Sequence, residues 1–150
     1  MALETLYNLT PSIGTSVAGT PPVWTYADLS AGIDNISESL NEVVQQYFFL
    51  GDNGFARNHV TGMAPSFTLT GRRIAGDTAQ DFIFDDDVKY GLDTARESSF
   101  KLVAVEGAST ITLTVDCTIC NIQEWSGAAT DDSAISFGIR FNGAPTVTTT

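Results

Sequence analysis

The sequence predicts a mostly β or α+β domain with a short helix, and three observations support this class. Residues 66–70 alternate apolar and polar side chains, which is the two-residue period of a half-buried strand. Asp77 follows Gly76 and is placed to cap a short helix. Two longer alternating segments, 98–105 and 111–123, then occupy the C-terminal half.

The N-terminal part is predicted to be an extended arm followed by a strand. Residues 8–22 are rich in Thr, Ser, Gly and Pro, which oppose helix and leave little to bury. We therefore expect residues 1–22 to form an arm. Residues 23–29 alternate in character and are predicted to form a strand that begins after Pro21 and Pro22.

Residues 33–50 are compatible with either a helix or strands. A helical stripe is present, but the first half also alternates and the second half is rich in strand formers. Strand is the preferred interpretation because of the resemblance described below. The run Gly-Asp-Asn-Gly at 51–54 predicts a tight turn that ends this segment in either case.

The C-terminal half is predicted to be rich in strands. Residues 98–105 and 111–123 are joined by Glu-Gly-Ala-Ser at 106–109, which is typical of a hairpin turn. Residues 126–133 are predicted to form a loop and 134–141 a further strand, and residues 142–150 are expected to be a second extended tail.

Composition favours a single domain, 1–150, with a core that needs no metal or disulfide. The chain has 150 residues and a mass of 16.0 kDa. No apolar run reaches the ~20 residues of a membrane-spanning helix, and the start lacks a signal-peptide pattern, so we expect a cytoplasmic location and no membrane. The net charge of −11 argues against nucleic-acid binding. It indicates either plain solubility or a wall that repels phosphate.

The patterns of potentially catalytic and metal-binding residues predict no enzyme, no metal and no cofactor. Cys117 and Cys120 have C-x-x-C spacing within a predicted strand, where their sulfurs point to opposite faces. His59 is the one histidine, and no nucleophile motif accompanies its predicted loop. Residues 85–87 are three adjacent aspartates, which favour a solvated acidic helix end over a calcium loop.

The adjacent pair Arg72 and Arg73 carries two of the seven basic side chains. The pair lacks the glycine-rich cradle of a phosphate site. We expect it to meet carboxylates, either within the chain or on a neighbouring subunit.

The order of these segments resembles the tail tube proteins of long-tailed bacteriophages and of related phage-tail-like particles. The resemblance extends from about residue 23 to 145 and rests on the order of the predicted segments and on their residue composition. The segments that carry it are A-G-I-D-N-I-S-E-S-L-N at 31–41, G-D-N-G at 51–54, S-F-T-L-T-G-R-R at 66–73, G-D-T-A-Q-D-F-I-F at 76–84, and the C-terminal hairpin.

This resemblance implies a β-sandwich or barrel-like core with one short flanking helix and extended arms. It implies a structural virion protein that self-assembles into hexameric rings, which stack into a hollow tail tube for DNA and the tape measure protein during ejection. The implied partners are further copies of the chain, the tape measure protein, and the tail terminator and distal tail or tip proteins. Viral DNA would pass through without specific binding. The implied location is the virion tail, assembled in the bacterial host cytoplasm.

Within such a tube, the alternation predicts that Asp34, Glu38 and Glu42 line the channel, where negative charge would let DNA slide. Arg72 and Arg73 are the candidates for contacts between subunits. Open sheet edges would be completed by neighbouring chains.

Two other classes remain open from the sequence. A carbohydrate-binding or adhesive β-sandwich would use exposed aromatic side chains as a platform for sugar rings, and Trp24, Tyr26, Phe55 and Trp125 are available. A hydrolase would depend on His59.

Overall fold

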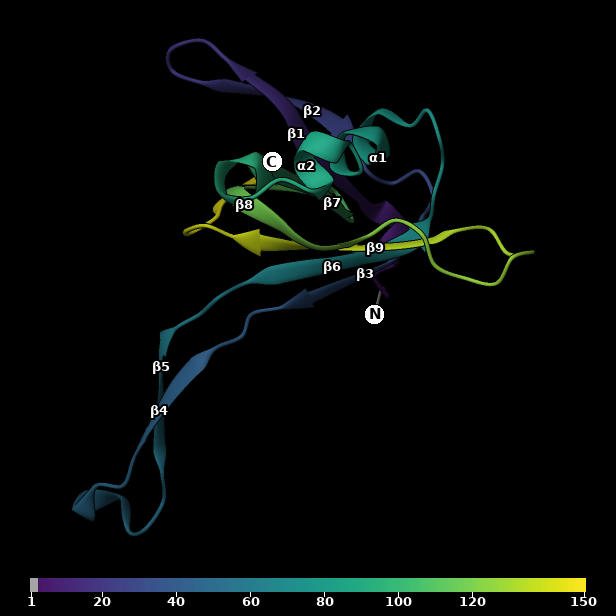
Figure 1. The fold of residues 1–150 in the computed structure, drawn as a ribbon. Coiled ribbons are helices and arrows are strands. Elements are labelled where there is room, and N and C mark those ends of the chain that lie inside the picture. The colour runs from purple at the N-terminus through teal and green to yellow at the C-terminus, as the bar shows by residue number, and fades with distance from the viewer. Residues whose placement is uncertain (1–2) are drawn as a thin grey trace.

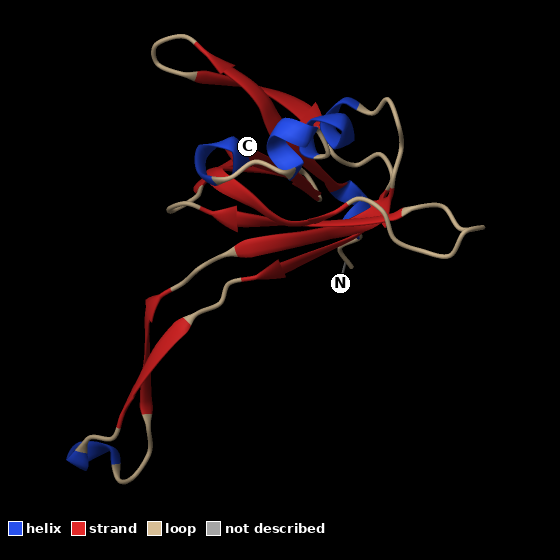
Figure 2. Ribbon diagram, viewed as in Figure 1, coloured by secondary structure: helices blue, strands red, loops and turns tan. Residues whose placement is uncertain are grey.

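The computed structural model describes residues 3–150, which fold into a curved antiparallel sheet, a projecting two-stranded ribbon and short helices (Figures 1 and 2). The strands are β1 (Leu9–Ala18), β2 (Val23–Asp28), β3 (Ile33–Ser39), β4 (Val43–Tyr47), β5 (Arg57–Gly62), β6 (Ser66–Arg72), β7 (Glu97–Glu106), β8 (Ser109–Gln123), β9 (Ala134–Phe141) and β10 (Thr146–Thr149). The α-helices are α1 (Thr78–Ile83) and α2 (Asp86–Lys89), and 3₁₀ turns span Leu6–Asn8, Leu50–Asp52 and Asp93–Arg96.

The eight-stranded sheet has the strand order β2-β1-β7-β8-β9-β6-β3, and β10 pairs with the first half of β8. Residues from both ends of this order, Ile13 and Ala27 at one end and Ile36 at the other, pack on one core. The sheet is therefore curved around that core in a barrel-like manner. The mostly β fold that the sequence predicts is confirmed, with two short helices in place of one.

The core lies between the inner face of the sheet and the two helices. Phe67 of β6 packs against Phe100 of β7, with ring centroids 5.4 Å apart. Phe84, which follows α1, meets Phe137 of β9 edge to face at 6.4 Å. The other fully buried large apolar side chains are Ile13, Leu29, Leu69, Ile83, Ile119, Ile135 and Ile139.

The best-patterned segments form as predicted. Strand β6 covers the alternating run at 66–70, and the hairpin of β7 and β8 covers the predicted pair. The Asp77 side chain accepts a hydrogen bond from the Gln80 backbone N–H at 3.2 Å, so it caps α1. The ambiguous residues 33–50 contain strands β3 and β4, and the helical alternative is wrong.

The two terminal segments differ from the prediction of extended arms. Strand β1 lies inside the sheet, paired with β2 on one side and β7 on the other. Strand β10 pairs with β8 through Thr146–Thr149. Thr, Ile and Val suit a strand. Main-chain pairing on both sides and three buried residues, Pro11, Ile13 and Gly14, hold β1 in place.

Candidate assembly surfaces

The projecting ribbon of β4 and β5 is the most exposed feature of the chain. Within residues 3–150, these two strands pair only with each other, and the ribbon extends away from the body (Figure 1). Every residue of β4 is exposed. An isolated two-stranded hairpin in water is marginally stable, so contact with a further protein surface would stabilise the ribbon.

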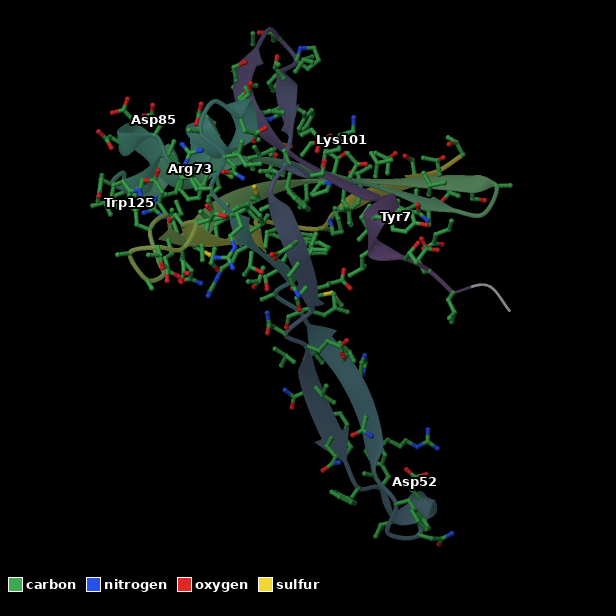
Figure 3. All side chains as sticks on the ribbon, turned by 90° about the vertical axis from the view of Figure 1, so that its right-hand side faces the viewer. Tyr7, Asp52, Arg73, Asp85, Lys101 and Trp125 are labelled. Atoms are coloured by element: carbon green, nitrogen blue, oxygen red, sulfur yellow. The ribbon has the colours of Figure 1, made fainter. Side chains whose placement is uncertain are left out.

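The tip of the ribbon, residues 48–55, is apolar and ordered by polar contacts. Phe48 and Phe55 are 66% and 77% exposed, and Leu50 is fully exposed. The Arg57 guanidinium donates two hydrogen bonds, of 2.7 and 3.1 Å, to the Asp52 carboxylate. Figure 3 places Asp52 at the far end of the ribbon. The tip therefore presents a fixed apolar surface of the kind that marks an interaction site.

The ribbon also carries apolar side chains on both of its faces. Val44 lies opposite Val60 in the register, so these two share one face. Tyr47 lies on the other face, opposite Arg57, and its ring stacks on Phe49 with centroids 5.6 Å apart. All of them are exposed, so the ribbon offers contacts on both sides.

The sheet has open edges at β2 and at β3, the two ends of its strand order. Each edge presents backbone N–H and C=O groups that the described strands leave without a partner in the sheet. Such an edge is a template on which another chain can add a strand.

The three acidic residues predicted to line a channel do not continue one strand face. The register of β3 on β6 shifts between Ile33 and Asn35, which places Asp34 in a bulge. Glu38 lies opposite Phe67, on the inner side of the sheet at its margin, and is exposed. Glu42 falls after the end of β3, so the predicted alternation is wrong, although all three carboxylates are exposed.

Arg73 meets carboxylates within the chain, one of the two alternatives that the sequence left open. Its guanidinium donates to Asp81 at 2.7 Å and to Glu124 at 3.2 Å, and it lies over the Phe84 ring. Arg72 is exposed and donates one hydrogen bond, to the Asp132 carbonyl at 3.3 Å. A role for either arginine between subunits stays a prediction.

Glu124 joins β8 to the helical side of the molecule. Its carboxylate accepts hydrogen bonds from Arg73 and, at 2.9 Å, from Lys89, whose ammonium lies 3.6 Å from the centre of the Trp125 ring. Figure 3 shows Arg73 and Trp125 on the same flank. Burial favours the neutral acid, yet the hydrogen bonds from Lys89 and Arg73 hold the pKa of Glu124 below its ordinary value of 4.5.

Replacing Glu124 with Gln is expected to lower the free energy of unfolding at pH 7 by roughly 1–3 kcal/mol. The Glu124 side chain is only 12% exposed, and its loss leaves Lys89 without its carboxylate partner and Arg73 with Asp81 alone. A carboxylate with a lowered folded pKa stabilises the protein above its unfolded pKa. The difference between wild type and variant should therefore disappear as the pH falls below about 4.5. Urea unfolding from pH 3 to 8 measures this stability difference, and the variant of an exposed acid, Glu106→Gln, is the control. A difference that does not change with pH would contradict the role given to the Glu124 carboxylate.

The residues considered for catalysis or metal binding are not brought together. His59 is an exposed residue of β5, so its predicted position in a loop is wrong. Burial raises the pKa of the Cys117 thiol to about 12, which leaves it unreactive at neutral pH. Asp85 caps α2, and the other two aspartates of the run occupy its first turn.

Over residues 3–150, no cluster of three or more His, Cys, Asp or Glu side chains is suited to a metal ion. Among the same residues, no helix has the length and apolar character required to cross a membrane.

The aromatic side chains considered for sugar binding lie on separate parts of the molecule. Trp24 and Tyr26 belong to β2 and are half-buried, and the Tyr26 hydroxyl is hydrogen-bonded to Ser99 at 2.8 Å. Phe55 lies at the ribbon tip, and Trp125 follows β8 under Lys89. The four do not form one platform.

No family profile matches the sequence, and no curated protein is similar to it in sequence. The fold is similar to that of a chain in the tail of an empty gene transfer agent (GTA) particle with C6 symmetry. The TM-score is 0.67 and the identity 14%, and the match covers 97% of this chain and 99% of the other.

Two further solved structures contain similar chains. One is the virion of a native GTA particle, with a TM-score of 0.60, 15% identity, and coverage of 97% of this chain and 99% of the other. The other is the six-fold symmetrised baseplate of the anti-feeding prophage, with a TM-score of 0.56, 11% identity, and coverage of 99% and 97%. The chain therefore has the fold of tail components of phage-tail-like particles.

The apolar ribbon tip is the surface that sequence reasoning missed. The signal was present, because Phe48, Phe49 and Leu50 precede the Gly-Asp-Asn-Gly turn and Phe55 follows it. Apolar residues on both sides of a tight turn favour exposure at a tip over burial in a core, since the turn must remain near the surface.

Proposed function

We propose that the chain is the tube subunit of a phage tail or of a phage-tail-like particle. In this proposal it is a structural protein that self-assembles into hexameric rings, and the rings stack into a hollow tube through which DNA and the tape measure protein pass. The observation that carries the proposal is the β4–β5 ribbon, which exposes an apolar tip from a body with the fold of a tail component.

The physical argument starts from what must cover this tip. A monomer in water gains nothing from exposing Phe48, Leu50 and Phe55, whereas burying each on a neighbour contributes about 1.5–3 kcal/mol. A projection that enters a different surface of the next copy makes a head-to-tail contact. Such contacts give rings where they close and open stacks where they do not.

The further partners belong to the same proposal. The tube would end on a tail terminator at one side and on distal tail or tip proteins at the other, within a virion tail assembled in the host cytoplasm. Arg72 is the better inter-subunit candidate, because Arg73 is already engaged by Asp81 and Glu124. No catalytic role is part of the proposal.

The proposed channel wall includes Asp34, Glu38 and Glu42, which are exposed. Replacing all three with Lys should slow or stall DNA ejection from otherwise intact tails, because a basic wall binds phosphate. Measuring ejected DNA over time tests this. The charge-matched control replaces Asp86, Asp87 and Glu106 with Lys. If the variant of Asp34, Glu38 and Glu42 ejects DNA at the wild-type rate, these three residues do not line the channel.

Negative-stain electron microscopy of the purified chain tests the proposed function itself. A concentration series, with and without a tail-tip extract as seed, should yield hollow tubes of stacked rings. Dispersed monomers at every concentration, seeded or not, would contradict it, and a glycan array would then test the carbohydrate-binding alternative.

A further inference from the structure

We propose that a groove between residues 6–11 and 33–36 receives the β4–β5 ribbon tip of a second copy of the chain. This inference rests on the proposed function, since it names the surface that one subunit offers to the next. It assigns a docking site to the tip and thereby fixes which parts of two copies meet.

The groove is small and mostly apolar. It has a volume of about 280 Å³, slightly below the roughly 300–1,000 Å³ of sites for small ligands. A space of this size suits one or two apolar side chains. Its apolar lining consists of Leu6, Tyr7, Leu9, Pro11, Ile33 and Ile36, and its polar lining of Ser30, Asp34 and Asn35.

The N-terminal wall of the groove is itself uncovered. Tyr7 is 85% exposed, and Leu6 is also exposed. Both belong to the 3₁₀ turn Leu6–Asn8, which leads into β1. Apolar side chains fixed on a short helical turn beside an apolar hollow favour a partner that supplies further apolar surface.

The other wall of the groove is the beginning of β3, an edge strand of the sheet. Ile33 and Ile36 line the groove, while β6 occupies one side of β3 and leaves its other side open. An inserted segment can therefore gain backbone hydrogen bonds from the edge as well as apolar contact.

The ribbon tip has the chemistry that this groove requires. Phe48, Leu50 and Phe55 supply exposed apolar side chains. The ribbon over residues 43–62 carries one acid and one base, Asp52 and Arg57, which are paired with each other, so the formal charge of −11 lies on the rest of the chain. A segment without net charge can approach another acidic copy without strong repulsion.

The placement of the tip and the groove makes the contact intermolecular. The groove lies at the first residues of β3, and the ribbon leaves from the opposite end of that strand. The ribbon then runs away from the body, and Figure 3 separates Tyr7 on the flank from Asp52 at the tip. A tip that enters the groove of another copy makes a head-to-tail contact, which propagates along a stack.

The two other cavities suit an apolar tip less well. One, of about 570 Å³, is bordered by the carboxylates of Glu97 and Asp116. The second, of about 610 Å³, is lined by five polar residues, Arg140 among them, and three apolar ones. The small groove also borders one carboxylate, that of the exposed Asp34. Six of its nine lining residues are apolar, against four of nine and three of eight in the other two cavities, so burying phenylalanine side chains there costs the least desolvation energy.

Paired cysteines test the contact in the full chain. The variant Leu50→Cys with Tyr7→Cys is assembled into tubes and mildly oxidised, then run on a non-reducing gel. Each chain has one tip and one groove, so a ladder of covalent multimers is expected, at least tenfold above that of the control pair Leu50→Cys with Tyr90→Cys. The single variants show the background from Cys117 and Cys120.

If the cysteine pair prevents tube assembly, photocrosslinking tests the same contact. A photoreactive phenylalanine analogue at position 55 should crosslink to residues 6–11 or 33–36 of another chain, as read by mass spectrometry. Tubes that crosslink elsewhere overturn the docking proposal and leave the proposed function standing. Absence of wild-type tubes at every concentration, seeded or not, overturns both.

Discussion

Replacing Phe48, Leu50 and Phe55 together with Ser is expected to abolish tube assembly while leaving the fold of the monomer intact. These side chains are exposed and contribute little to the body of the chain, so each should change the free energy of unfolding by no more than about 0.5 kcal/mol. Losing several kcal/mol of burial at each subunit contact should raise the protein concentration at which tubes form by more than about 100-fold.

The measurement combines electron microscopy over a concentration series with urea unfolding of the same samples. The matched control is the variant Tyr90→Ser with Leu92→Ser, which removes two exposed apolar side chains from the helical side of the body. The control should assemble at the wild-type concentration. Normal tubes from the tip variant would show that the ribbon tip makes no contact that assembly requires.

Much of the fold could be predicted because most strands carry their core pattern locally. In β8, Val115, Cys117 and Ile119 alternate, and all three are buried on one face. The same period places Phe137 and Ile139 of β9 in the core. Where burial on one face dictates every second residue, the sequence alone predicts the strand.

The terminal strands lack this pattern, which explains why they were predicted to be arms. Strand β10 has no buried residue. It is held by pairing with residues 111–114 of β8, which the Thr150 backbone extends with two hydrogen bonds to Thr110. Strand β1 gains its position from β2 and β7, which are distant pairing partners. Main-chain pairing leaves no trace in side-chain periodicity, so a composition rich in Thr, Ser and Gly predicts extended arms in place of paired strands.

The candidate site was less predictable than the fold for a related reason. The shift between Ile33 and Asn35 moves Asp34 off the face that simple alternation assigns to it. A bulge of this kind is fixed by the strand that it meets, here β6, and not by residues near it in the sequence. Predicting which side chains share a surface therefore required the register as well as the period.

The bulge also points to the position where a single methyl group should do the most damage, Gly71 in β6. A Cβ atom built on Gly71 would lie 2.0 Å from the carbonyl oxygen of Gly32 and 2.7 Å from the Cα of Ile33, both of them backbone atoms that cannot rotate away. We expect Gly71→Ala to lower the free energy of unfolding by about 2–4 kcal/mol, because β3 must move off β6.

This displacement reaches beyond the substituted residue. The Gly32 carbonyl oxygen also accepts a hydrogen bond from the Arg72 N–H at 2.8 Å, which the displacement would break, and β3 leads directly into the ribbon. Urea unfolding followed by circular dichroism measures the loss. The control is Gly62→Ala in β5, where a Cβ atom would meet Val43 at an ordinary 3.8 Å and where stability should stay unchanged or rise slightly. Equal stability of the two variants would mean that β3 and β6 are not held as close as the register requires, and the orientation of the ribbon root would then have to be set by another contact.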